Sequence, residues 1–141
     1  IFIPYGVSVD EFQHWVYENP NHTEEERADR WFEILKEFSS PVIDFTRLDE
    51  YRRFAWHRQL HLFEVPFYYI EYGIAQLGAI GLWQQYKNNP ESAINNYLKA
   101  LELGGTKTLP ELFRAAGLQF DFSPAYISQL MGFVKKEMDS L

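Results

Sequence analysis

The feature that most constrains the fold is a regular series of helix start and stop signals along the whole chain. Thr23 with Glu26, and Thr108 with Glu111, have the spacing of capping boxes, in which each side chain can bond the backbone N–H of the other residue. Proline and glycine interrupt the apolar pattern between these starts, for example at Pro41. The sequence contains no sustained alternation of apolar and polar residues, which would indicate strands. It therefore predicts an all-α fold, a helical bundle of about six or seven helices.

Individual helix boundaries follow from the same signals. Ser8 is expected to cap the first helix, and the Asn-Pro-Asn turn at residues 19–21 is expected to end it. A helical period over residues 48–62 predicts one helix, which Pro66 either kinks or separates from the next. Residues 67–86 are apolar almost all round, which predicts a central helix. Later boundaries are expected at Asn89 with Pro90, at Gly104 with Gly105, at Thr108, at Gly117, and at Ser123 with Pro124. No linker divides the sequence, so one helical unit is expected.

Charge and hydropathy argue against two classes of partner. The net charge is −7 and the sequence pI is about 5.0, and no basic stripe is present, so a nucleic-acid partner is not expected. The longest apolar run, residues 74–83, is far shorter than the roughly 20 residues that span a bilayer. The chain contains no cysteine, which excludes disulfides and thiolate metal ligands. It starts with Ile1 and lacks the pattern of a secretory signal, so we expect it to begin inside a longer protein.

Two histidines, His57 and His61, have the spacing that lets imidazoles on one helical face share a zinc ion. In the HEXXH motif of zinc peptidases, the residue after the first histidine is a glutamate that acts as general base, whereas here it is Arg58. A zinc site also needs a third protein ligand, and Glu64 is the only acidic residue nearby. Ordinary, partly buried histidines are therefore favoured, and no metal ligand is predicted.

Three tyrosines, Tyr68, Tyr69 and Tyr72, follow these histidines. Tyr69 and Tyr72 are three residues apart, so both hydroxyls can point to one side of a helix. Phenols at this spacing can donate to a carbonyl or an oxyanion, and they can equally be core aromatics with their hydroxyls at the surface. Spacing alone favours packing and leaves the function open.

A different resemblance covers residues 82–105, LWQQYKNNPESAINNYLKALELGG, which look like one tetratricopeptide repeat, a helix pair that binds partner peptides. Only one copy is visible, and such repeats need neighbours to bury their faces, so a generic helical hairpin is favoured. The alternative function that remains is a free-standing helical peptide-binding module without catalysis.

Three blocks together carry a resemblance to a peptidase family: PYGVSVDEFQHWVYENPNHTEEER, RQLHLFEVPFYYIEYGIAQLGA and YLKALELGGTKTLPELFRAAGLQFDFS. The chain resembles the C-terminal part of an oligoendopeptidase F, in the zinc metallopeptidase family that includes thimet oligopeptidase. The resemblance implies that residues 1–141 are a single helical unit, a portion of a larger and mainly helical catalytic domain. No HEXXH occurs in the chain, so the zinc-binding helix is expected upstream. Zinc is therefore expected in the full-length enzyme and not in this chain, which alone is expected to be inactive.

The resemblance also implies a site. His61, Tyr69 and Tyr72 match the family's substrate-positioning histidine and tyrosines, and Tyr68 is an alternate for the first tyrosine. Tyr72 or Tyr69 would act in catalysis by donating a hydrogen bond to the oxyanion that forms from the scissile carbonyl. His61 would hold a backbone carbonyl of the peptide. In the family's mechanism, the upstream glutamate activates a zinc-bound water.

The function implied is hydrolysis of short peptides by a cytoplasmic zinc metalloendopeptidase, to which this chain contributes substrate binding. The expected partners are peptide substrates, with no nucleic acid and no membrane. A chain that exposes its former domain contact would carry an apolar patch, so self-association through that contact is also considered.

Overall fold

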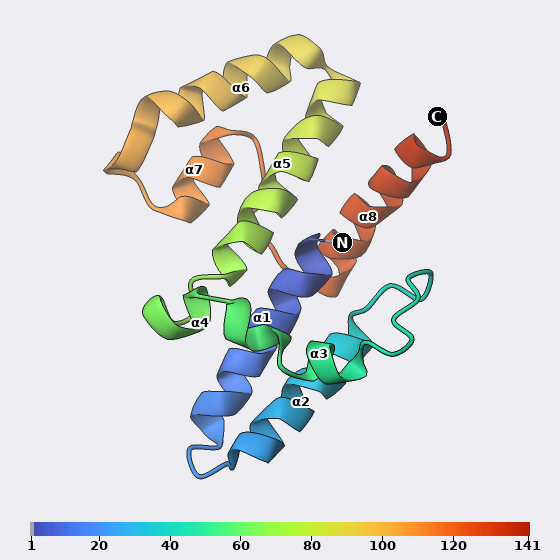
Figure 1. Ribbon diagram of the computed structural model, residues 1–141. Helices are drawn as coiled ribbons and strands as arrows, with labels where there is room; N and C mark the ends of the chain where they lie inside the picture. Colours follow the sequence, from blue (N-terminus) through green and yellow to red (C-terminus); the bar gives the residue numbers. More distant parts are fainter. Residues whose placement is uncertain (1) are drawn as a thin grey trace. The chain divides into compact units, whose positions relative to one another are not determined.

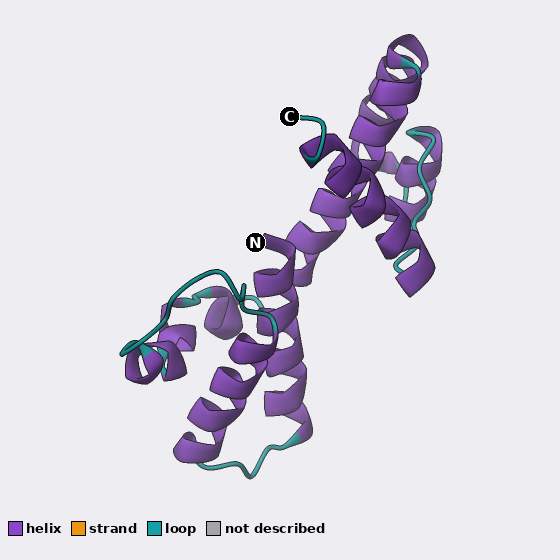
Figure 2. Cartoon of the chain, turned by 90° about the vertical axis from the view of Figure 1, so that its right-hand side faces the viewer, coloured by secondary structure: helices purple, strands orange, loops and turns teal. Residues whose placement is uncertain are grey.

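The structure is a computed structural model that describes residues 2–141. All regular elements in this part of the chain are helices (Figure 2). They are eight α-helices and two short 3₁₀ helices. The all-α prediction is confirmed, with slightly more helices than expected. The chain contains two compact units, Ile1–Ile74 and Ala75–Leu141, which are described one at a time. That the whole chain acts as one portion of a catalytic domain stays a prediction.

The first unit is built on a pair of helices, α1 (Phe2–Glu18) and α2 (Glu24–Glu37), which lie side by side (Figure 1). Three short elements follow: α3 (Asp49–Arg53), which contacts α2, the 3₁₀ helix η1 (Ala55–Arg58) and α4 (His61–Glu64). The helix α5 (Ile70–Asn88) begins at the end of this unit. The core consists of buried apolar side chains from α1, α2 and η1, namely Val9, Phe12, Trp31, Ile34 and Trp56.

The first helix starts earlier than the sequence predicted. Ser8 is not an N-cap but lies inside α1, fully buried, where its hydroxyl donates to the backbone carbonyl of Pro4. Pro4 does not prevent this early start, because the N–H groups of the first helical turn have no intrahelical acceptor in any case. The end of α1 just before the turn at residues 19–21 agrees with the prediction.

The prediction of a single helix over residues 48–62 is wrong, because this segment is divided into α3, η1 and α4. The indole nitrogen of Trp31 donates to the carbonyl of Arg52 at 2.9 Å. In a continued α-helix that carbonyl would accept from the N–H of Trp56, four residues on. The break instead allows Trp56 to reach the core, where it is 8 % exposed. Pro66 lies between α4 and α5 and therefore separates two helices.

The second unit contains most of α5, followed by α6 (Pro90–Leu103), the 3₁₀ helix η2 (Gly104–Thr106), α7 (Leu109–Ala115) and α8 (Pro124–Met138). Asn89 accepts a hydrogen bond from the N–H of Ser92, and Ser123 accepts one from the N–H of Tyr126, so both predicted N-caps are confirmed. In this unit α6 contacts α7.

The end of α7 depends on a glycine. Gly117 has φ +73°, a left-handed conformation in which a side chain is strained. A Cβ at this position would also lie 3.1 Å from the amide nitrogen of Asn96 and 3.2 Å from the amide oxygen of Gln85. Gln85 uses its amide nitrogen to donate to the carbonyl of Gly117 at 2.6 Å, which links α5 to this turn within the second unit.

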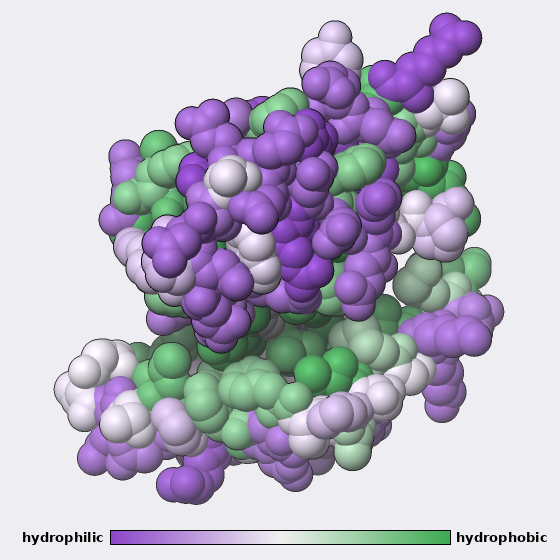
Figure 3. Space-filling model, turned by 90° about the horizontal axis from the view of Figure 1, so that it is seen from below, coloured by the Kyte–Doolittle hydropathy of each residue, from purple (hydrophilic) through white to green (hydrophobic). Residues whose placement is uncertain are grey.

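Large apolar side chains remain at the surface of both units. On α6, Ile94, Leu98 and Leu101 are about half exposed, and their spacing places them on one helical face. Figure 3 shows one side of the molecule, on which apolar residues reach the surface. No helix among residues 2–141 has the length and apolar character needed to cross a membrane.

Both predicted capping boxes are present. In the box that begins α2, Glu26 accepts hydrogen bonds from the N–H and the hydroxyl of Thr23, and the N–H of Glu26 donates to the Thr23 hydroxyl. The backbone and side-chain hydrogen bonds from Thr23 hold the pKa of Glu26 below its ordinary value of 4.5. Glu111, which forms the same box with Thr108, has a lowered pKa for the same reason.

Lowering the pH is expected to remove the stabilisation that the Glu26 carboxylate gives to α2. Because the folded-state pKa lies below the ordinary value of 4.5, this stabilisation is fully present above that pH and is lost as the pH falls through the folded-state pKa. Glu26→Gln can still accept from Thr23 but does not titrate. Urea unfolding of the two proteins at several pH values should therefore show a stability difference that shrinks on acidification.

Glu24→Gln is the matched control, since it removes a carboxylate from the same helical turn without a contact to Thr23. A wild-type advantage over Glu26→Gln that stayed constant down to pH values well below the ordinary carboxyl pKa would contradict the assignment.

Candidate functional site

The four residues singled out from the sequence meet in the first unit. His61 opens α4, Tyr68 and Tyr69 lie in the connection between α4 and α5, and Tyr72 lies in the first turn of α5. We call these four side chains the aromatic cluster. The ring of His61 meets those of Tyr69 and Tyr72 edge to face, with centroids 5.0 and 5.7 Å apart. The rings of Tyr68 and Tyr69 both contact Tyr72, at 5.7 and 5.3 Å.

The aromatic cluster rests on the start of α1. Tyr69 packs against Tyr5 with centroids 6.0 Å apart and against Phe2 at 6.3 Å. Tyr69 is half-buried in consequence, whereas Tyr72 is 38 % and Tyr68 45 % exposed. The hydroxyls therefore belong to a surface-accessible cluster and not to a sealed interior.

A chain of hydrogen bonds runs through the aromatic cluster from α1 to α5. The hydroxyl of Tyr5 donates to the amide oxygen of Gln59 at 3.1 Å. The amide nitrogen of Gln59 lies 2.7 Å from Nδ1 of His61, and Nε2 of His61 lies 3.3 Å from the hydroxyl of Tyr72. Gln59 and His61 each have a partner on both sides, so the orientation of the imidazole is fixed.

This series of hydrogen bonds assigns the proton positions on His61 and Tyr72. An amide nitrogen can only donate, so Nδ1 of His61 must accept from Gln59. The neutral imidazole then carries its proton on Nε2, which donates to the oxygen of Tyr72. The hydroxyl hydrogen of Tyr72 is consequently not used in this series of hydrogen bonds and is available to another acceptor, such as a bound ligand.

Tyr69 and its neighbour Tyr5 are kept in their protonated form. Burial, and then the neighbouring Tyr72, raises the pKa of Tyr69 above its ordinary value of 10.0. Burial is also the main reason that the pKa of Tyr5 is raised, with a further contribution from Tyr69. A phenol whose pKa lies above 10 is a hydrogen-bond donor and not a phenolate at neutral pH.

The connection between α4 and α5 has an unusual backbone. Phe67 has φ +59°, a left-handed conformation that is rare for an aromatic residue and that persists only where the surroundings hold it. The N–H of Phe67 donates to the amide oxygen of Gln13 at 2.8 Å, and the Phe67 ring contacts His14 and Tyr17 on α1. These contacts with α1 fix the segment that carries Tyr68 and Tyr69.

The two histidines with zinc-like spacing are used differently. His61 has protein partners on both ring nitrogens, whereas His57 packs on Trp56 with centroids 4.0 Å apart. They lie in separate elements, η1 and α4, and not on one helix. No three histidine, aspartate or glutamate side chains within residues 2–141 lie close enough to hold a metal ion.

Sequence reasoning missed two members of the site, Gln59 and Tyr5. Gln59 lies two residues before His61, in a segment rich in histidine and tyrosine. Its role depends on Tyr5, which is 54 residues away in the sequence. No periodicity or spacing rule connects residues so far apart, so only the packing of α1 against the α4–α5 connection could reveal the pair.

Comparison with known proteins finds similarity over most of the chain. Residues 1–132 match the sequence model of peptidase family M3. The oligoendopeptidase F homolog of Borreliella burgdorferi is 28% identical over 101 residues, which are 69% of this chain and 16% of that protein.

Two solved structures share the fold over 99% of this chain, each with 39% sequence identity and a TM-score of 0.89. One is a 3.1 Å X-ray structure of a protein provisionally named oligoendopeptidase F, and the other is PZ peptidase A with an inhibitor. The present chain spans 25% of each of these solved chains, and 16% of the Borreliella relative. The similarity is therefore to one part of considerably longer proteins.

Proposed function

The chain belongs to peptidase family M3, and on that premise we propose that it supplies the substrate-binding portion of a zinc metalloendopeptidase of the oligoendopeptidase F type. The enzyme would hydrolyse short peptides. The observation that carries the proposal is the exposed Tyr72 hydroxyl, which receives a hydrogen bond from His61 and keeps its own hydrogen for an outside acceptor.

Tyr72 is assigned the role of oxyanion donor. When a peptide bond is attacked, its carbonyl oxygen gains negative charge, and a donor already in position stabilises the transition state more than the ground state. The hydrogen bond from Nε2 of His61 increases the polarity of the Tyr72 O–H bond, because linked hydrogen bonds polarise one another. Tyr69, held protonated and packed against Tyr72, is the second donor of the proposal.

His61 and Tyr68 are assigned to substrate binding. The 3.3 Å separation between Nε2 of His61 and the Tyr72 oxygen is longer than a typical hydrogen bond. A backbone carbonyl of a bound peptide can therefore share the Nε2 proton. Tyr68 is 45 % exposed beside these two rings and offers a further phenol for peptide contact.

Zinc in the full-length enzyme is part of the proposal, and peptidases of family M3 are generally zinc-dependent. The metal would polarise the scissile carbonyl and activate a water molecule. Its ligands are assigned to sequence outside residues 1–141, because this chain has no HEXXH motif. The isolated chain is accordingly proposed to be inactive.

The proposal includes short peptides as partners and a cytoplasmic location, both as the family resemblance implies. The half-exposed apolar residues of α6, Ile94, Leu98 and Leu101, support a contact with another part of the peptidase, or with a second copy when the chain is isolated. The alternative of a free-standing peptide-binding module has less support, since the family match extends over residues 1–132 and not only over the repeat-like residues 82–105.

Hydrolysis of an internally quenched peptide tests the function. The full-length protein that carries residues 1–141 is expected to cleave the peptide, and removal of its metal with a chelator is expected to stop cleavage. Residues 1–141 alone are expected to give no cleavage and no bound zinc by elemental analysis. Cleavage by the isolated chain, or one tightly bound zinc in it, would overturn the assignment of the metal to another part of the protein. A full-length protein that binds peptides without cleaving them would support the module instead.

A further inference from the structure

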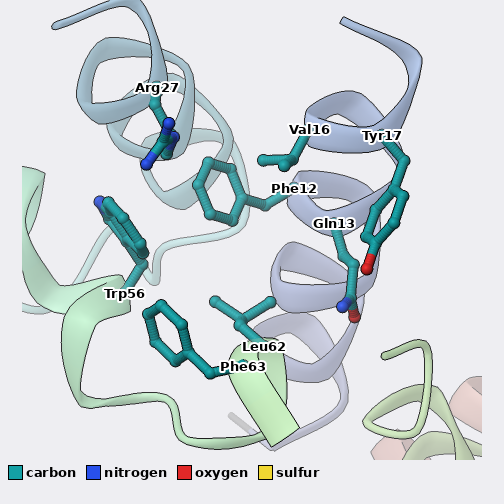
Figure 4. A pocket seen from close by; sticks show the side chains of 8 residues that line it. All are labelled: Phe12, Gln13, Val16, Tyr17, Arg27, Trp56, Leu62 and Phe63. Carbon is teal, nitrogen blue, oxygen red and sulfur yellow. The ribbon is translucent and has the colours of Figure 1, made fainter. Parts of the chain in front are cut away.

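The first unit contains a cavity that the proposed function does not use. Its volume is about 190 Å³, and it opens between α1, α2, η1 and α4. Figure 4 shows the side chains around it, which are mostly apolar and aromatic: Phe12, Val16, Tyr17, Trp56, Leu62 and Phe63. Two polar side chains, Gln13 and Arg27, also line it. None of the four residues of the aromatic cluster does.

Gln13 brings an unused hydrogen-bond donor to this cavity. The side chain is 3 % exposed, and its amide oxygen already accepts from the N–H of Phe67. The amide nitrogen has no hydrogen-bond partner among the described residues. Figure 4 shows this nitrogen on the side of Leu62, within the lining. A buried donor without a partner costs free energy, so an acceptor in the cavity would be bound favourably.

Arg27 brings a positive charge to the opposite side. Figure 4 shows its guanidinium near the indole of Trp56, across the cavity from Gln13, and its central carbon lies 5.6 Å from the centroid of that indole. Nε of Arg27 donates to His22 at 2.6 Å. Within residues 2–141, no carboxylate lies within salt-bridge distance of Arg27, in contrast to Arg30 and Arg53, which are paired. The indole nitrogen of Trp56 also has no partner in this part of the chain.

The size of the cavity limits what it can hold. An apolar cavity of about 150 Å³ holds a benzene molecule, so a space of about 190 Å³ takes one aromatic ring with short substituents. The ring would contact Phe12, Leu62 and Phe63. An anionic substituent would meet Arg27, and an acceptor oxygen on the other end would meet the amide nitrogen of Gln13.

We propose that this cavity is a binding site for a small aromatic carboxylic acid that carries a second acceptor oxygen at the far end of its ring. The carboxylate pairs with Arg27, and the acceptor oxygen receives the hydrogen bond of Gln13. The site is separate from the aromatic cluster, although Leu62 and Phe63 share α4 with His61.

The test compares the binding of 3-(4-methoxyphenyl)propionate with the binding of the corresponding uncharged primary amide. The ether oxygen of both compounds can only accept a hydrogen bond. Binding of each to the full-length protein that carries residues 1–141 is measured by isothermal titration calorimetry at low ionic strength. The acid is expected to bind at least about tenfold more tightly than the amide, because a charge-assisted hydrogen bond to a guanidinium is about twice as strong as a neutral one.

Two variants assign the contacts. Arg27→Gln is expected to remove the preference for the acid over the amide. Arg30→Gln is the matched control, because Arg30 lies on the same helix, pairs with Glu11 and does not line the cavity. Gln13→Glu keeps an oxygen for the N–H of Phe67 and replaces the donor by an acceptor. It is expected to weaken binding of the acid by at least about tenfold.

Three results would overturn the proposal. They are the absence of binding at millimolar ligand, equal binding of acid and amide by the wild-type protein, and a preference for the acid that survives Arg27→Gln. The first would mean that the cavity is filled by another part of the full-length protein. The readout is binding and not turnover, so failure here is distinct from failure of the proposed peptidase function.

Discussion

Replacing Tyr72 by phenylalanine in the full-length protein is expected to lower kcat for peptide hydrolysis by about 10²–10³, the usual effect of removing one oxyanion donor. The substitution removes only the hydroxyl, so the ring contacts of Tyr72 with His61, Tyr68 and Tyr69 persist. KM is expected to change little, because the donor acts mainly on the charge that develops in the transition state. Steady-state kinetics with a fluorogenic peptide separate the two quantities.

Tyr51→Phe is the control for this experiment. Tyr51 belongs to the same unit, is 77 % exposed and lies outside the aromatic cluster. The kcat of the Tyr51→Phe variant should therefore equal that of the wild-type protein. If Tyr72→Phe retained the wild-type kcat, or if its entire effect were on KM, Tyr72 would not be the oxyanion donor.

A companion variant, Gln59→Glu, tests how His61 directs the Tyr72 hydroxyl. A carboxylate at position 59 can only accept, so a neutral His61 would carry its proton on Nδ1 and would take the Tyr72 hydrogen with Nε2. The Tyr72 hydrogen would then be bound by His61 and not free for the oxyanion. The kcat of Gln59→Glu, measured by the same steady-state kinetics, should therefore be lower than that of the wild-type protein. A kcat equal to that of the wild-type protein would leave Gln59 with a structural role only.

Replacing Trp31 by alanine is expected to lower the free energy of unfolding of the first unit by about 3–5 kcal/mol. Trp31 is 0 % exposed, and its ring meets Phe12 with centroids 5.2 Å apart. Its indole nitrogen also donates to the carbonyl of Arg52, which would lose this partner. Urea unfolding of the 141-residue chain, followed by circular dichroism, measures the change.

Trp31→Phe is the matched variant, since it retains an aromatic ring in the core and removes the indole donor. Trp31→Phe is expected to lower the free energy of unfolding less than Trp31→Ala does, because the phenylalanine ring fills part of the space that the indole occupied. Trp83→Ala provides a second control, because Trp83 is 40 % exposed and lies in the other unit. A loss below about 1 kcal/mol for Trp31→Ala would show that the side chain is not central to the core.

The sequence predicted helix starts well where the signal was local. The capping boxes at Thr23 and Thr108 and the N-caps at Asn89 and Ser123 were all placed correctly, because a cap is made by groups within three residues of each other. The same reasoning failed at Ser8. A serine can cap a helix or bond back to a carbonyl within one, and the local sequence does not distinguish these.

The failure over residues 48–62 has a different origin. The apolar period there was real, but it did not describe one helix. Trp31, from a helix far earlier in the chain, binds the carbonyl of Arg52 that a continued helix would need. The burial of Trp56 then stabilises the broken form. A contact between distant segments outweighed a local preference.

The candidate site also combines features that the sequence predicted with features that only the tertiary structure shows. The resemblance to the peptidase family proposed His61, Tyr69 and Tyr72 as a group, which their spacing alone did not, and the structure brings their rings together. The sequence did not predict the direction in which the hydrogen bonds run through the group. That direction depends on Gln59 and on Tyr5 from α1.

By itself, the sequence determined the all-helical class and most of the helix boundaries. These properties depend on groups near one another along the chain. Only the tertiary structure decided where the segment before Pro66 breaks, which nitrogen of His61 holds the proton, and that Gln13 and Arg27 face one cavity. Each of these depends on contacts between helices whose residues are far apart in sequence, and no local pattern encodes such contacts.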